Sequence, residues 1–147
     1  MTTKRLTLCG DMGQLEKLRL FVDSASDVYE LNERARYRLQ LVCEELVTNI
    51  ISYGYDGATR QHAEIEVCLS QGPGCTEVCL TDNGVPFNPL TLPEPDLKAG
   101  IEERRIGGLG IHFARTLAET IAYERREERN RLEMTLRTQQ QKEDVAE

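Results

Sequence analysis

The feature that most constrains the fold is a long stretch, residues 33–53, whose apolar side chains recur at helical spacing. Its stripe, at intervals of three and four residues, consists of Leu39, Val42, Cys43, Leu46, Ile50 and Tyr53. A helix with one such apolar stripe must bury it against other elements. The stretch therefore predicts a core helix, and Gly54 and Gly57 mark its end.

The segments around this helix predict the layer against which it packs. Strand-like alternation of apolar and polar residues appears in residues 4–10, 64–70, 75–81, 121–126 and 131–137. Helical spacing appears again in residues 11–29 and 109–119, and Asp11 is placed to cap the first of these helices. We therefore expect an α/β protein, a two-layer sandwich whose mixed, mainly antiparallel sheet carries three helices on one face.

The size and charge of the chain limit its domain count and its partners. Its 147 residues suit one domain, which we place at residues 1–137, followed by a loose Gln-rich tail at residues 138–147. The sequence has no apolar run long enough to span a membrane and no signal peptide. A net charge of −7 disfavours nucleic-acid binding, which depends on Lys and Arg. We expect a cytoplasmic protein whose partner is a protein or a small molecule.

The five cysteines are odd in number and form no CxxC pair. They are Cys9, Cys43, Cys68, Cys75 and Cys79. This pattern predicts reduced, mostly buried thiols rather than a disulfide framework or a zinc site.

Glu45 and Asn49 are the first candidate functional residues. They are four residues apart, so they lie on one face of the expected helix and interrupt an otherwise apolar segment. A carboxylate beside an apolar stripe is costly unless something pairs with it, and an amide oxygen suits Mg²⁺. The alternative is that both residues simply face solvent on a half-exposed helix.

Two further motifs lie at the borders of the long irregular segment that follows the first hairpin. Asp82 and Gly84 stand where a core strand ends, and a glycine there lets a flat ligand approach the backbone, although Asp-Asn-Gly also suits a plain turn. Gly107, Gly108 and Gly110 open the third helix, where free N–H groups bind anions. A flexible hinge is the alternative for this second motif.

Taken in order, the three motifs resemble those of the GHKL ATPase/kinase superfamily. The segment with Glu45 and Asn49 looks like its N box, residues 82–87 match its DxGxxF box, and residues 108–110 match its GxG box. The chain looks most like the anti-sigma-factor serine/threonine kinases of the RsbW-like branch, over about residues 6–136. This resemblance implies the Bergerat ATP-binding fold.

The resemblance also implies a role for each matching position. Asn49 would hold Mg²⁺, Asp82 would accept a hydrogen bond from the adenine amino group, and Glu45 would be the general base. The remaining ATP-binding positions would be Gly84, Arg105, Gly107, Gly108, Leu109 and Gly110, with Arg104 an alternative to Arg105. Residues 88–106 would form a lid over the nucleotide. Tyr53 stands where relatives often have a histidine, so a charged phosphate contact is not expected there.

The implied activity is ATP-dependent phosphorylation of serine or threonine on an antagonist protein, coupled to binding of a sigma factor. The resemblance also suggests a homodimer. Two other functions stay open at this point: an ATP-gated protein-binding module without phosphotransfer, and a stand-alone ATP hydrolase.

Overall fold

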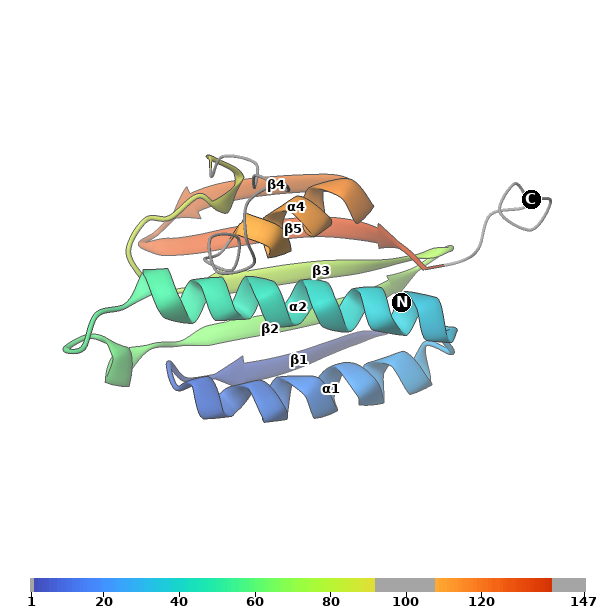
Figure 1. The fold of residues 1–147 in the computed structure, drawn as a ribbon, viewed down its shortest axis with the longest axis horizontal. Coiled ribbons are helices and arrows are strands. Elements are labelled where there is room, and N and C mark those ends of the chain that lie inside the picture. The colour runs from blue at the N-terminus through green and yellow to red at the C-terminus, as the bar shows by residue number, and fades with distance from the viewer. Residues whose placement is uncertain (1, 92–107, 139–147) are drawn as a thin grey trace, which may run out of the picture.

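The computed structural model of the protein describes residues 2–91 and 108–138, which form two layers (Figure 1). One layer is a five-stranded sheet of order β1-β2-β3-β5-β4. Its strands are β1 (Thr3–Leu8), β2 (Ile65–Gly72), β3 (Cys75–Asp82), β4 (Ala118–Arg126) and β5 (Arg129–Arg137). The expected two-layer α/β sandwich is confirmed, and all four described strand pairings are antiparallel rather than mixed.

Among the described residues, three helices cover one face of this sheet, as the sequence predicts (Figure 1). They are α1 (Leu15–Val28), α2 (Glu33–Gly54) and α4 (Gly108–Leu117), and the shorter 3₁₀ turns are η1 (Met12–Gln14), η2 (Arg60–His62) and η3 (Pro89–Thr91). The long α2 lies between α1 and α4 and packs against both. No helix in the described part of the chain is both long and apolar enough to cross a membrane.

Both ends of α2 are held by side chains from outside the helix. At its start, Oδ1 of Asn32 accepts a hydrogen bond from the backbone N–H of Ala35 at 2.8 Å, which satisfies one orphan donor. At its end, the Arg60 guanidinium donates to the carbonyls of Ile51 at 2.9 Å and Tyr55 at 3.3 Å. A cation here also interacts favourably with the helix dipole. Arg60 also donates to the carbonyl of Gly10, just after β1, at 3.2 Å, so it ties the end of α2 to that end of the sheet.

The core lies between the two layers, and the strands contribute to it through every second residue. On β3 the inward residues are Thr76, Val78, Leu80 and finally Asp82, all buried. On β5 they are Asn130, Leu132, Met134 and Leu136, also buried. The core face of each strand therefore carries a polar residue at the same end of the sheet, because Asp82 pairs with Asn130.

The third helix is shorter than the sequence predicts. It ends at Leu117 rather than near residue 119, and β4 begins at Ala118 rather than Ile121. Ala118 already pairs with Leu136 of β5, and an irregularity in the register follows between Ala118 and Thr120. Residues 118 and 119 therefore belong to a strand that pairs with β5, although their local sequence pattern is also compatible with a helix.

The prediction that the cysteines are mostly buried is wrong, although all five are free thiols. Cys43, on the apolar stripe of α2, is buried, and this burial raises its pKa to about 12. Cys68, Cys75 and Cys79 are half-buried and Cys9 is exposed. Cys68 and Cys79 alternate with inward residues of β2 and β3, so they lie on the face of the sheet opposite the described helices.

The last described residue, Thr138, lies one position beyond the domain boundary that we placed at residue 137, and the loose tail stays a prediction. The backbone N–H of Thr138 still donates to the carbonyl of Gly74 at 3.0 Å, beside the β2–β3 turn. Residues 139–147 lie outside the described part of the chain.

Candidate functional site

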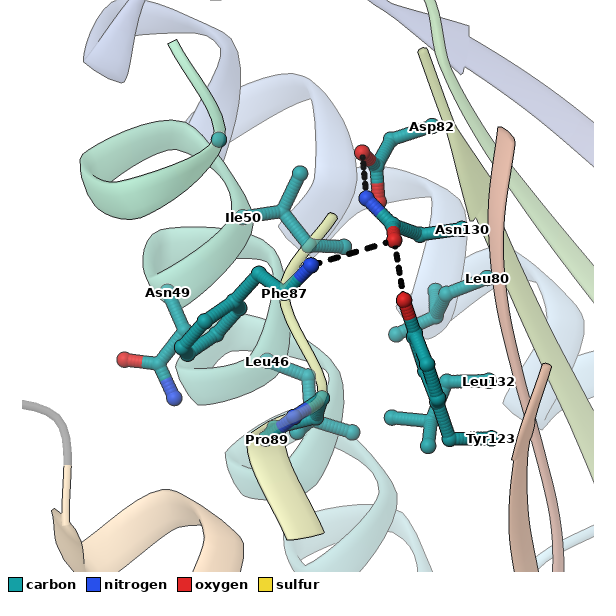
Figure 2. Close-up of a pocket in the computed structure, with 11 residues that line it drawn as sticks. Leu46, Asn49, Ile50, Leu80, Asp82, Phe87, Pro89, Tyr123, Asn130 and Leu132 are labelled. Atoms are coloured by element: carbon teal, nitrogen blue, oxygen red, sulfur yellow. Dashed lines mark hydrogen bonds between the residues drawn. The ribbon is translucent and has the colours of Figure 1, made fainter. Parts of the chain in front are cut away.

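A small pocket lies between α2 and the end of the sheet where β3 and β5 pair (Figure 2). Its lining consists of Leu46, Asn49, Ile50, Gly54, Leu80, Asp82, Phe87, Pro89, Tyr123, Asn130 and Leu132. Most of this lining is apolar, and the polar side chains are few. Asp82 and Asn130 lie on one side of the pocket, and Asn49 and Phe87 lie on the other (Figure 2). Such a pocket suits a flat ligand with a polar edge.

Asp82 is a buried carboxylate, 4% exposed. Its Oδ1 accepts hydrogen bonds from the backbone N–H of Gly84 and from Nδ2 of Asn130, each at 2.9 Å. Burial raises the pKa of Asp82, and the hydrogen bond from Asn130 acts in the opposite direction. Both hydrogen bonds that the described residues make to this carboxylate use Oδ1, so one oxygen is held by the protein.

Asn130 connects the separate parts of this pocket. Its Nδ2 donates to Oδ1 of Asp82 and, at 2.8 Å, to the carbonyl of Val85. Its Oδ1 accepts from the backbone N–H of Phe87 at 3.2 Å and from the hydroxyl of Tyr123. An amide side chain has two N–H donors and two acceptor lone pairs, so these four bonds use its whole capacity. Asn130, 5% exposed, therefore fixes its neighbours.

The sequence analysis missed Asn130 because it placed this residue in the turn of the last hairpin. The actual turn is Glu127 and Glu128, and β5 already includes Asn130. A signal was present in the alternation, since Asn130 precedes Leu132 at the two-residue spacing of the core face. Asp82 and Asn130 share this signal: each is a polar residue at the two-residue spacing of an otherwise apolar strand face.

The loop after β3 is packed against the end of α2. A Cβ atom on Gly84 would lie 2.6 Å from the carbonyl oxygen of Gly54, so a larger residue cannot fit without a shift. The N–H of Val85 donates to the same carbonyl at 2.9 Å. Backbone packing thus accounts for the glycine at position 84, which the sequence analysis attributed to the approach of a ligand.

Asn83, in the same loop, is bound to the segment that precedes β2. Its Oδ1 accepts from the N–H of Glu64 at 2.8 Å and from the hydroxyl of Tyr55 at 2.6 Å. Its Nδ2 donates to the carbonyl of His62 at 3.0 Å. Side chains and backbone groups from several elements therefore hold the loop that carries the candidate motif.

Asn49 and Glu45 are the predicted residues on α2. Asn49 is buried, 4% exposed, and lines the pocket opposite Asp82. Glu45, one turn earlier, is half-buried and is not among the residues that line this pocket. Burial raises the pKa of Glu45, and the neighbouring carboxylate of Glu44 raises it further. The structure thus places Asn49 in the pocket with Asp82, and Glu45 outside it.

Tyr53 lies one helical turn after Asn49, and its ring contacts Phe87. The ring centroids are 5.3 Å apart and the planes are tilted by 33°. Since Phe87 lines the pocket, Tyr53 supports one wall of it. This contact gives the tyrosine a packing role at the position where the sequence analysis doubted a phosphate contact.

The glycine-rich motif is described only in part. Gly108, Leu109 and Gly110 form the first turn of α4, which packs against α2 beside the pocket. The first N–H groups of a helix have no partner within it, so they are suited to anions. Arg104, Arg105 and Gly107 lie outside the described residues, as do residues 92–106 of the expected lid.

The chain is similar to known proteins in sequence and in fold. It matches the family model of the histidine kinase-like ATPase domain over residues 10–136. It is 29% identical, over 103 residues, to the serine/threonine-protein kinase BtrW of Bordetella bronchiseptica, and the match covers 69% of this chain and 70% of that protein.

Two solved structures share the fold. The RsbU and RsbW domains of Rv1364c from Mycobacterium tuberculosis match 96% of this chain with a TM-score of 0.67 and 13% identity, and this chain spans 34% of that chain. The histidine kinase domain of the Erythrobacter litoralis EL346 blue-light activated histidine kinase matches 92% of this chain and 64% of that chain, with a TM-score of 0.52 and 14% identity.

The family match covers most of the chain and all three motifs of the site. It confirms the resemblance seen in the sequence and indicates a nucleotide-binding domain of the ATPase/kinase kind. The chain therefore belongs to the histidine kinase-like ATPase domain family.

Proposed function

We propose that this chain is an ATP-dependent protein serine/threonine kinase of the anti-sigma-factor type, which phosphorylates an antagonist protein and binds a sigma factor. The observation that carries this proposal is the buried Asp82 at the end of an apolar pocket, with one oxygen held by Asn130 and Gly84. The name of the relative BtrW supports the kinase activity, and the likeness of fold to an RsbW domain is consistent with it.

The lining of the base end is chemically suited to adenine. Leu46, Ile50 and Leu132 offer apolar surfaces to a flat ring. Because Asn130 and Gly84 occupy Oδ1 of Asp82, Oδ2 is the oxygen that would accept the adenine amino group. Guanine presents a carbonyl at the corresponding position and would meet the same carboxylate unfavourably. Gly84 contributes by allowing the loop to pack on α2.

The phosphate end would combine residues of α2 and the start of α4. Asn49 is the residue that would hold Mg²⁺, and its amide oxygen is a suitable hard ligand. Mg²⁺ takes few protein ligands and keeps several waters, so the phosphates and water would supply the other ligands. The backbone N–H groups of Gly107, Gly108, Leu109 and Gly110, with Arg105, would bind those phosphates.

Glu45 would be the general base. It would take the proton from a serine or threonine hydroxyl of the partner as that oxygen bonds to the γ-phosphorus and the bond from the γ-phosphorus to the bridging oxygen of ADP breaks. Its raised pKa brings the carboxylate closer to the range in which a base is effective at neutral pH. Glu45 is only half-buried and does not line the base pocket, so a base bound there would leave it open to a second protein.

The proposal is tested by mass spectrometry and calorimetry on the purified chain. ATP with Mg²⁺ should bind, and incubation with a candidate antagonist should add one phosphoryl group to a serine or threonine of that partner. ATP-dependent partner binding without a phosphorylated product would instead indicate an ATP-gated binding module. Release of free phosphate without any partner would indicate a stand-alone hydrolase.

The role of Glu45 is tested separately with Glu45→Gln. This variant should bind ATP as the parent chain does and lose phosphotransfer. Glu77→Gln, which alters an exposed carboxylate of β3, is the control and should transfer normally. Normal transfer by Glu45→Gln would exclude Glu45 as the base.

A further inference from the structure

Arg125 lies beside the base end of the pocket and is not part of any motif in the sequence. In β4 it pairs directly with Asn130 of β5. Residues that pair across antiparallel strands project on the same face, so both side chains reach the loop after β3. Nη1 of Arg125 donates to the carbonyl of Gly84 at 2.7 Å, and Nδ2 of Asn130 donates to the next carbonyl, of Val85, at 2.8 Å. Together they hold two successive carbonyls.

The peptide group between Gly84 and Val85 links this arginine to the long helix. Its carbonyl accepts from Arg125, and its N–H donates to the carbonyl of Gly54 at the end of α2. A hydrogen bond from a guanidinium is charge-assisted and polarises the peptide that receives it. One side chain of β4 thus strengthens the contact that sets the distance between the loop and α2.

The charge of Arg125 also acts on Asp82. Burial raises the pKa of Asp82, and the hydrogen bonds from Asn130 and Gly84 and the positive charges of Arg125 and Arg129 lower it. Tyr55, after α2, faces the same carboxylate, and burial raises the pKa of that tyrosine to about 12, so it stays neutral near pH 7. Arg125 therefore helps keep the carboxylate ionised, the form that accepts a hydrogen bond.

We infer that Arg125 is a positioning residue for recognition of the base: it holds the Gly84 carbonyl, and with it the loop that follows Asp82, without touching the nucleotide. This inference rests on the proposed function, since it concerns the same pocket. Arg125 lies on the edge strand β4, whereas the sequence motifs of the site lie on α2, after β3 and at the start of α4.

The experiment measures ATP affinity in the presence of Mg²⁺ by calorimetry, from about pH 5 to about pH 8. Arg125→Met should weaken ATP binding about tenfold at neutral pH, because a charge-assisted hydrogen bond to the loop is lost. It should also move the acidic loss of affinity to higher pH, because Asp82 then protonates more readily. Arg125→Lys keeps the charge and should retain the parental pH midpoint.

Arg126→Met is the matched control, since Arg126 is the exposed neighbour of Arg125 on the same strand. Circular dichroism of each variant checks that it is folded. If Arg125→Met behaves as Arg126→Met does, or loses affinity without a shift in pH midpoint, the inference is overturned. If Arg125→Met does not fold, Arg125→Lys tests the inference instead. A shift of its pH midpoint from the parental value would overturn the inference. Failure of the parent chain to bind ATP at any pH would instead refute the proposed function.

Discussion

The two ends of the candidate site are built differently. At the base end, residues of β3, β4 and β5 are joined by hydrogen bonds that centre on Asn130. At the phosphate end, the described candidates are Asn49 and Glu45 on α2 and the first turn of α4. The base end is thus part of the fold and is assembled before any ligand arrives, whereas Glu45 is half-buried on one helix.

This difference separates the expected effects of mutation. Because a buried polar network is costly to leave half-satisfied, changes at the base end should affect both stability and nucleotide binding. A change of Glu45 should affect the chemistry and spare the fold. If changes at the base end spared stability, or if a change of Glu45 destabilised the fold, the two ends would not differ as described.

The largest effect is expected for Asp82→Asn, which should weaken ATP binding about 1,000-fold because an amide N–H₂ would face the adenine amino group. The same variant should raise the stability of the ligand-free protein near pH 7. Since burial raises the pKa of Asp82 in the folded state, its ionised form costs stability above that pKa, and Asn removes this cost. Calorimetry with ATP and urea unfolding measure the two effects.

Asp27→Asn, a change at an exposed side chain of α1, is the control for this experiment. Its ATP affinity should match that of the parent chain. An Asp82→Asn variant that binds ATP normally would remove Asp82 from base recognition.

A second large effect is expected for Asn130→Ala, which leaves the partners of a buried amide without their hydrogen bonds. The free energy of unfolding should fall by about 3 kcal/mol, measured by urea unfolding without ligand. A loss below about 0.5 kcal/mol would mean that the base end is not the integrated structure described above.

A smaller effect, of opposite sign, is expected at the β4–β5 turn. Glu127 and Glu128 adopt φ values of 51° and 64°, which are unfavourable for glutamate and suit an Asn-Gly turn. The double substitution Glu127→Asn and Glu128→Gly should raise the free energy of unfolding by about 1 kcal/mol. ATP affinity should stay unchanged, since the register between Arg125 and Asn130 is retained. A lower melting temperature would contradict this.

The smallest effect on stability is expected for Glu45→Gln. Burial and Glu44 raise the pKa of Glu45, so its ionised form is slightly unfavourable, and Gln should leave stability equal or higher within about 0.5 kcal/mol. Thermal unfolding followed by circular dichroism is sufficient to test this. A large loss would place Glu45 in the fold rather than in the chemistry.

Much of the fold is predictable from the local pattern of the sequence. The residue spacing predicts α2 within one residue of its observed bounds and both hairpins within about three residues. The local pattern does not give the strand order, in which β5 rather than β4 lies beside β3. Pairing between strands distant in sequence depends on tertiary contacts that no short window contains.

The same limit applies to the candidate site. Asp82 and Asn49 are recognisable because each belongs to a compact motif. Asn130, Tyr123 and Arg125 join the site only through the pairing of β3 with β5 and of β5 with β4. Each is an ordinary strand residue in sequence, so its role appears only when the sheet is assembled.

The fully used amide of Asn130 has an evolutionary consequence. A substitution at position 130 alone should be disfavoured, because the new side chain would also have to bind the Asp82 carboxylate, the Tyr123 hydroxyl and two backbone groups. Positions 82, 123 and 130 should therefore covary among close relatives of this chain. A lineage that lost the asparagine would be expected to carry a compensating change at Tyr123.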